Sequence, residues 1–145
     1  MKKIFVINGP NINILGKREN EIYGNLSYSD LNNILKNYAR DKGADLEIFQ
    51  SNNEGEIINK IQELIGSDYA GLIINPAAYS HYSYAIYDAL KALNIKKVEV
   101  HLTNILARDE FRKTSITAAA CDGVITGFNF DSYKLAIEYL LREEL

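Results

Sequence analysis

The residues of this chain best suited to acid–base chemistry near neutral pH are its two histidines, His81 and His101. A free imidazole titrates at a pH of about 6.5, so it can donate or accept a proton under physiological conditions. Each histidine follows an apolar run and has amide side chains nearby, and Arg108 and Arg112 come soon after His101. Arginine binds carboxylate and phosphate groups with paired hydrogen bonds. This arrangement indicates a polar pocket for a small, oxygen-rich ligand that carries a negative charge.

Two further side chains, Glu99 and Cys121, bear on this chemistry. Glu99 precedes His101 by two residues, so on a strand both side chains point to the same side and can meet. A structural salt bridge explains Glu99 equally well. The single cysteine, Cys121, follows three alanines and is interpreted as a small buried thiol, because nothing beside it would activate a nucleophile.

Several common site motifs are missing from the sequence. It contains no G-x-G-x-x-G, no G-x-x-x-x-G-K-[ST] and no G-x-S-x-G, so dinucleotide binding, P-loop binding and a nucleophile elbow have no support. His81, His101 and Cys121 do not have metal-site spacing. The first apolar run ends without the acidic pair of a phospho-acceptor domain, and no Ser/Thr/Gly-rich cradle for a flavin phosphate follows it.

Composition places the chain among soluble globular proteins. It has 145 residues, of which 47% are hydrophobic and 24% charged, and these values fit one domain spanning 1–145. The net charge of -3 and the absence of a Lys/Arg run argue against a nucleic-acid partner. A lone cysteine fits a reducing compartment. No apolar run is long enough for a signal peptide or a membrane span, so a cytoplasmic protein with no membrane partner is expected.

The apolar patterning predicts the elements that position these side chains. Short apolar runs, interpreted as strands, alternate with amphipathic segments that end near glycine. The predicted strands are 4–7, 46–49, 70–74, 98–100 and 124–125, and the predicted helices are 27–42, 56–65, 82–93 and 133–141. Strands that are apolar on both faces favour a parallel sheet covered by helices. We therefore expect an α/β fold, a flavodoxin-like doubly wound five-stranded parallel sheet in the order 2-1-3-4-5.

Two segments do not fit this alternation. Residues 11–27 are polar and lack clean periodicity, so they are predicted to form a long loop, in which residues 17–24 act as a lid. Residues 102–122 contain charged stretches, with a short helix expected at 114–120.

In such a sheet ligands bind beyond the carboxyl ends of the strands. The polar side chains that follow the predicted strands are Asn8, Asn11 and Asn13; Gln50, Ser51 and Glu54; Asn75, Ser80 and His81; and His101, Thr103, Asn104, Arg108 and Arg112.

Four motifs in this order resemble the type II 3-dehydroquinate dehydratase family, and together they span nearly the whole chain. The first is N-G-P-N-I-N-I-L-G-x-R-E at 8–19, with Tyr23-Gly24 after it. The others are Q-S-N-x-E-G-E at 50–56, N-P-A-A-Y-S-H at 75–81, and E-V-H-L-T-N at 99–104 followed by Ala107-Arg108 and Phe111-Arg112.

The resemblance implies a lyase that dehydrates 3-dehydroquinate to 3-dehydroshikimate by anti elimination through an enolate. This is a step of the shikimate pathway toward aromatic amino acids, and quinate breakdown uses the same step. No cofactor or metal is implied. The resemblance also implies a homo-oligomer, a dodecamer built from trimers.

The resemblance also implies a role for individual residues. Tyr23 is the general base, Arg18 favours its phenolate, Asn11 holds a water that stabilises the enolate, and His101 is the general acid, oriented by Glu99. Substrate-binding roles fall to Asn75, with the backbone amides of Leu102 and Thr103, for the carboxylate; to His81 and Arg112 for the ring hydroxyls; and to Asp88 of a neighbouring subunit.

Tyr23 can act as the base only if Arg18 lowers the pKa of its hydroxyl group. A free tyrosine has a pKa of about 10, so only about one in a thousand is ionised at pH 7. A nearby cation lowers such a pKa by about 1–3 units.

Some positions depart from the family pattern. Thr103 is found where the family commonly has serine, and Tyr87 where it commonly has arginine. Leu106 and Thr114 replace frequent histidines. The glycine-rich stretch that follows the fifth strand in the family is reduced at 128–131.

Two other interpretations remain open. A different enolate-forming lyase or isomerase on the same scaffold would act on a related acid. A non-catalytic module would bind a small acid without turning it over.

Overall fold

The structure, a computed structural model, describes residues 1–17 and 25–143. Five parallel strands form one sheet in the order β2-β1-β3-β4-β5, which confirms the predicted order and the flavodoxin-like class. The strands are β1 (Lys2–Asn8), β2 (Ala44–Gln50), β3 (Gly71–Asn75), β4 (Lys96–His101) and β5 (Gly123–Thr126).

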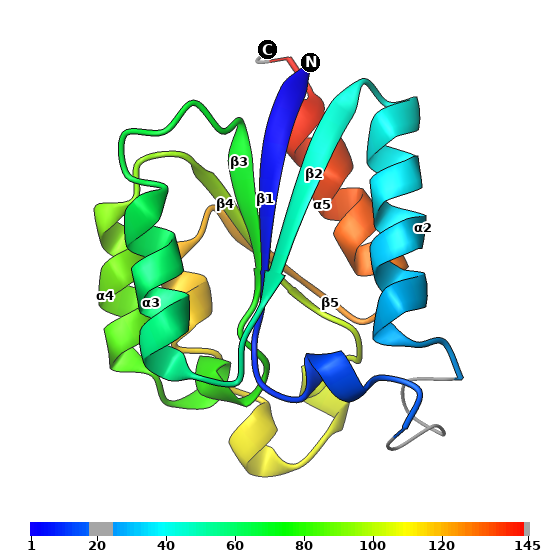
Figure 1. Cartoon of the computed structure of the whole chain (residues 1–145). Helices are drawn as coiled ribbons and strands as arrows, with labels where there is room; N and C mark the ends of the chain where they lie inside the picture. Colours follow the sequence, from blue (N-terminus) through cyan, green and yellow to red (C-terminus); the bar gives the residue numbers. More distant parts are fainter. Residues whose placement is uncertain (18–24, 144–145) are drawn as a thin grey trace.

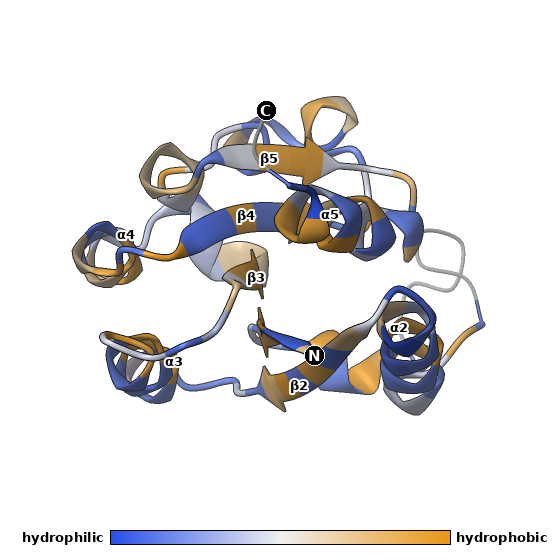
Figure 2. Ribbon diagram, turned by 90° about the horizontal axis from the view of Figure 1, so that it is seen from above, coloured by the Kyte–Doolittle hydropathy of each residue, from blue (hydrophilic) through white to orange (hydrophobic). Residues whose placement is uncertain are grey.

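Within the described ranges, four α-helices cover the sheet, two on each face. α2 (Tyr28–Asp41) and α5 (Asp131–Leu141) lie on one face, and α3 (Glu54–Glu63) and α4 (Tyr84–Ala92) lie on the other (Figure 1). Figure 2 shows the same two layers from above. None of the helices in the described ranges is long and apolar enough to cross a bilayer.

The helices begin where polar side chains cap them. Ser27 and Asp30 form a reciprocal capping box at the start of α2. Asn53 caps α3 and Ser83 caps α4 by accepting a hydrogen bond from a backbone N–H three residues later. Such caps satisfy backbone donors that a helix leaves unpaired. For this reason α3 begins two residues before the predicted start and α4 two residues after it.

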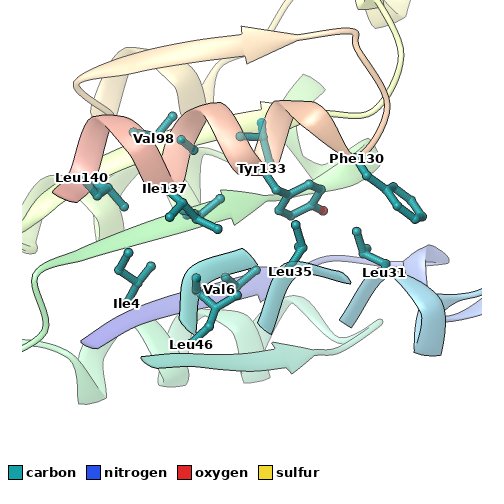
Figure 3. Packing of buried hydrophobic residues seen from close by; sticks show 14 of the residues in the cluster. Ile4, Val6, Leu31, Leu35, Leu46, Val98, Phe130, Tyr133, Ile137 and Leu140 are labelled. Atoms are coloured by element: carbon teal, nitrogen blue, oxygen red, sulfur yellow. The ribbon is translucent and has the colours of Figure 1, made fainter. Parts of the chain in front are cut away.

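Each face of the sheet has its own apolar core. On the α2/α5 side, Ile4 and Val6 of β1 pack among Leu35, Ile137 and Leu140, as Figure 3 shows. On the α3/α4 side, the alternate β1 residues join a second buried cluster: Phe5, Ile7, Ile57, Ile61, Leu72, Ile74, Ile86 and Leu90. Strands buried on both faces explain why their sequences are continuous apolar runs.

The two irregular segments contain short 3-10 turns. Ile12–Ile14 forms one turn, with Ile12 buried, within the stretch predicted to be a loop. After β4 come turns at Ile105–Ala107, Glu110–Arg112 and Thr117–Ala120. The helix expected at 114–120 is therefore only a 3-10 turn at its end. The Thr114 carbonyl accepts a hydrogen bond from His81 and the Ile116 N–H donates to Ser80, so neither bonds within a helix.

Candidate active site

The carboxyl ends of three adjacent strands lie level with one another. Asn8, the last residue of β1, pairs in register with Gln50 of β2 and with Asn75 of β3. A pocket opens beyond these ends, between the segments that follow β1, β3 and β4. Its lining residues are Pro10, Asn11, Ile12, Asn75, Ala77, Ala78, His81, His101, Leu102, Thr103, Ile105, Arg108 and Arg112.

The pocket brings together most of the predicted site residues that the structure describes. Asn11, Asn75, His81, His101, Leu102, Thr103 and Arg112 line it. Glu99 is fully buried behind His101. Asp88 is exposed on α4 and does not line this pocket. Arg18 and Tyr23 lie outside the described residues.

The imidazole of His101 is held by a buried carboxylate. His101 Nε2 lies 2.8 Å from Glu99 Oε2, and Ser115 Oγ donates to the same oxygen at 2.5 Å. Thr117 Oγ1 donates to Glu99 Oε1. Because the carboxylate accepts, Nε2 carries the proton of this contact and Nδ1 is the other ring nitrogen. Such second partners fix the tautomer and the ring orientation of a histidine.

Ser115 and Thr117 are site residues that the sequence reasoning missed. They lie 16 and 18 residues after Glu99, in the irregular segment before β5. Neither belongs to a motif or a periodic pattern, so no signal in a single sequence identifies them.

His81 is fixed by the same irregular segment. Its Nδ1 lies 2.8 Å from the carbonyl oxygen of Thr114, and a carbonyl can only accept, so Nδ1 carries a proton. The backbone N–H of Ile116 donates to the Ser80 carbonyl at 2.7 Å, and the Phe111 ring stands edge-on to the imidazole. In neutral His81, Nε2 is therefore the acceptor.

The loop after β1 packs closely against the loop after β3. The Gly9 N–H donates to the Asn75 carbonyl at 2.7 Å, and a Cβ at Gly9 would lie 2.5 Å from the Pro76 carbonyl oxygen. Asn11 follows with a φ of 71°, and its N–H donates to Asn52 Oδ1 at 3.0 Å. Gln50 also donates to Asn52 Oδ1. These contacts place Asn11 at the pocket rim.

Arg112 has capacity to bind an acceptor. Its Nε is buried without a hydrogen bond to any described residue, and it forms an ion pair with Asp109, whose Oδ2 lies 3.6 Å away. The guanidinium lies 4.7 Å from the centroid of the Phe111 ring. A buried donor of this kind favours a ligand that carries oxygen atoms.

The segment that carries Leu102 and Thr103 is anchored on its outer side. The Leu102 carbonyl accepts from the Asn129 N–H at 2.9 Å, and the Thr103 carbonyl accepts from Thr126 Oγ1 at 3.0 Å. Their carbonyl groups are therefore already bonded outside the pocket that these residues line.

The structure places no metal cluster or reactive thiol in the described ranges. No group of three or more His, Cys, Asp or Glu side chains gathers there in a way that could hold a metal ion. Burial, together with the nearby Glu99 charge, raises the pKa of the Cys121 thiol to about 12. Cys121 is partly buried, and its raised pKa agrees with the interpretation that it is not a nucleophile.

Comparison with known proteins gives concordant results. The model of one family, described as dehydroquinase class II, matches residues 2–141. A 3-dehydroquinate dehydratase of Caldicellulosiruptor saccharolyticus is 53% identical over 145 residues, 100% of this chain and 99% of the relative. One from Thermotoga neapolitana is 51% identical, over 95% of this chain and 93% of the relative. The crystal structure of a type II dehydroquinase from Butyrivibrio crossotus matches with a TM-score of 0.95 and 49% identity, covering 97% of this chain and 98% of that one.

Proposed function

Because this chain belongs to the class II dehydroquinase family, we propose that its pocket dehydrates 3-dehydroquinate to 3-dehydroshikimate by anti elimination through an enolate. The enzyme is a hydro-lyase of the shikimate pathway. The observation that carries the proposal is the buried Glu99–His101 pair at the floor of a pocket lined by Arg108 and Arg112.

The first step removes a proton from the carbon beside the ketone. Such a proton is weakly acidic, so the site needs a base and a group that stabilises negative charge on the ketone oxygen. We assign the base to Tyr23, with Arg18 favouring its phenolate. Asn11 holds the water that donates to the enolate oxygen. Support for these roles comes from the motif that carries all three residues.

The second step expels the hydroxyl group from the next carbon. Hydroxide is a poor leaving group, so a proton must reach its oxygen as the bond to carbon breaks, and water then leaves. We assign this proton to His101. Its Nε2–H is bonded to Glu99, so Nδ1 is the nitrogen that donates to the leaving oxygen. To donate from Nδ1 while Nε2–H stays bonded to Glu99, the ring must carry a proton on both nitrogens, so a proton has to reach Nδ1 before each turnover.

The other lining residues bind the parts of the substrate that do not react. We assign the carboxylate to Asn75 and to the backbone N–H groups of Leu102 and Thr103. Support comes from their common position in the pocket and from the carbonyl bonds that anchor the latter two residues. His81, with Nε2 as an acceptor, and Arg112, with its unbonded donor, bind the ring hydroxyls.

We further propose a homo-oligomer, a dodecamer built from trimers, in which Asp88 of one subunit approaches the pocket of its neighbour. The exposure of Asp88 on α4, outside its own pocket, supports this assignment. We also propose that the protein acts in the cytoplasm, as one catalytic domain spanning 1–145.

The direct test follows the absorbance of the conjugated enone when purified protein is mixed with 3-dehydroquinate in the presence of EDTA. Wild type is expected to turn over at an unchanged rate with chelator, and Tyr23→Phe is expected to be inactive. Tyr139→Phe is the matched control, because Tyr139 lies on α5 and does not line the pocket. A folded wild-type protein without turnover would refute the proposed function.

A further inference from the structure

We propose that Tyr133 of α5 is a positioning residue, whose hydroxyl turns the side-chain amide of Asn75 so that an N–H group faces the ligand. The inference rests on the proposed function, in which Asn75 binds the substrate carboxylate. Tyr133 does not line the pocket and is fully buried. Figure 3 shows it projecting from α5 into the layer that also holds Leu35 and Phe130.

The orientation of Asn75 is set first by a backbone group. The Ala77 N–H donates to one side-chain atom of Asn75 at 3.1 Å. A backbone N–H can only donate, so the atom that receives it is the carbonyl oxygen Oδ1. The nitrogen Nδ2 therefore occupies the other branch of the amide, 3.0 Å from the Tyr133 hydroxyl oxygen.

Tyr133 is well suited to hold that nitrogen. It has one hydroxyl proton, which it donates to Asn8 Oδ1 at 2.6 Å, so its oxygen is left to accept from Asn75 Nδ2. Burial raises the pKa of the Tyr133 hydroxyl well above its ordinary value, so the group stays protonated. Asn8 in turn donates from Nδ2 toward the Tyr28 hydroxyl at 3.5 Å.

This chain of contacts leaves one N–H of Asn75 for the pocket. Nδ2 carries two protons, Tyr133 receives one, and Asn75 lines the pocket. The ligand atom that meets it must be an acceptor, as a carboxylate oxygen is. Tyr133, Asn8 and Asn75 are each at most 2% exposed, so solvent does not replace a lost partner. The hydroxyl on α5 therefore contributes to anion recognition without touching the anion.

The experiment compares Tyr133→Phe with wild type in two assays. One is the KM and kcat for 3-dehydroquinate. The other is the calorimetric Kd for quinate, a ring acid that carries the carboxylate but lacks the ketone. The carboxylate does not react, so its contact acts equally on bound substrate and transition state. We expect KM and Kd to rise about tenfold and kcat to change less than about twofold, as the loss of one oriented hydrogen bond would cause.

Two further variants separate positioning from folding. Ile137→Val removes one buried methyl group from the same helix and touches no hydrogen bond. It is expected to lower the unfolding midpoint while KM and Kd stay unchanged. Asn8→Leu keeps the branching and the number of heavy atoms of the side chain and removes the acceptor of the Tyr133 proton, so it should raise KM and Kd as Tyr133→Phe does. It also keeps the inference testable if Tyr133→Phe fails to fold.

The outcomes distinguish the inference from the proposed function. Turnover by wild type with unchanged KM and Kd in Tyr133→Phe and Asn8→Leu would overturn the inference alone. Weaker quinate binding in both variants, without turnover by wild type, would support the inference and refute the proposed function. A wild type that binds neither acid contradicts both.

Discussion

The Nε2 atom of His101 lies 2.8 Å from Glu99 Oε2, and both side chains are buried at the end of β4. Glu99 is fully buried, and such a carboxylate is costly unless its oxygens are hydrogen-bonded. Ser115 and Thr117 complete its contacts. The catalytic assignment of His101 therefore depends on a segment that lies beyond the motif carrying both residues.

This dependence predicts that Thr117→Val lowers activity. The substitution keeps the shape of the side chain and removes the donor to Glu99 Oε1. Loss of a hydrogen bond to a charged group costs about 1.5–3 kcal/mol, so the free energy of unfolding should fall by that amount. The kcat should fall about tenfold, because Glu99 no longer holds His101 in one orientation, and KM should change little.

Steady-state kinetics and urea unfolding measure the two effects. Thr114→Val is the matched control, because the Thr114 side chain is exposed and only its carbonyl takes part in the site. Equal kcat in Thr117→Val and Thr114→Val would contradict the role given to Thr117.

The contact of Gly9 with the loop after β3 predicts a steric effect. In Gly9→Ala the new Cβ would lie 2.5 Å from the Pro76 carbonyl oxygen, which is backbone and cannot turn away. Overpacking of this kind costs about 1–3 kcal/mol. We expect lower stability and a higher KM, since displacement of this loop also moves Asn11. In contrast, Gly123→Ala meets no atom within 4 Å and should behave as wild type in both assays.

The sheet and the pocket could be predicted because their signals are local. β3 is apolar on both faces and ends in Asn75, and β4 ends in His101, so strand ends and polar side chains coincide in the sequence. The order of the sheet follows from the alternation of strands and helices.

The supporting contacts could not be predicted for a physical reason. Tyr133 fits the apolar stripe of α5, and nothing in that stripe distinguishes a packed ring from one whose hydroxyl holds Asn75. Ser115 reaches Glu99 from a segment without periodicity. That segment folds into 3-10 turns because its backbone groups bond elsewhere: the Thr114 carbonyl accepts from His81, and the Ile116 N–H donates to the Ser80 carbonyl. These are tertiary contacts, which a local sequence pattern does not show.

A buried lysine is predicted to stabilise the end of α4. Lys97 is 8% exposed, and its ammonium donates to the carbonyls of Leu90 and Leu93, the latter just after the helix. The last carbonyls of a helix have few partners within it, and here the Leu90 carbonyl also accepts from the Leu93 N–H at 3.1 Å. Lys97→Met keeps the length of the side chain but leaves the Leu93 carbonyl without this donor, at a cost of about 1–3 kcal/mol, whereas the Leu90 carbonyl keeps the Leu93 N–H.

Urea unfolding should show this loss for Lys97→Met. Lys91→Met is the comparison, because Lys91 is exposed in the last turn of α4. An equal midpoint for the two variants would mean that Lys97 contributes no more than a surface lysine.

The pKa of Cys121 predicts how its thiol reacts. The thiolate is the reactive form, and with a pKa of about 12 its fraction at pH 8 is about one in ten thousand. An unfolded cysteine, with a pKa of about 8.5, is roughly a quarter ionised at this pH. Iodoacetamide should therefore modify native protein at least a thousandfold more slowly than protein in guanidinium.

The raised pKa of Cys121 also determines how the free energy of unfolding changes with pH. Because folding raises the pKa, the folded state retains the proton at pH values where the unfolded thiol loses it. The contribution of Cys121 to stability is therefore complete below the unfolded pKa and is lost as the pH rises toward about 12. Cys121→Ala should show a smaller fall in unfolding free energy than wild type between pH values of about 8.5 and 10.5. Parallel curves for the two proteins would show that the thiol does not titrate as burial requires.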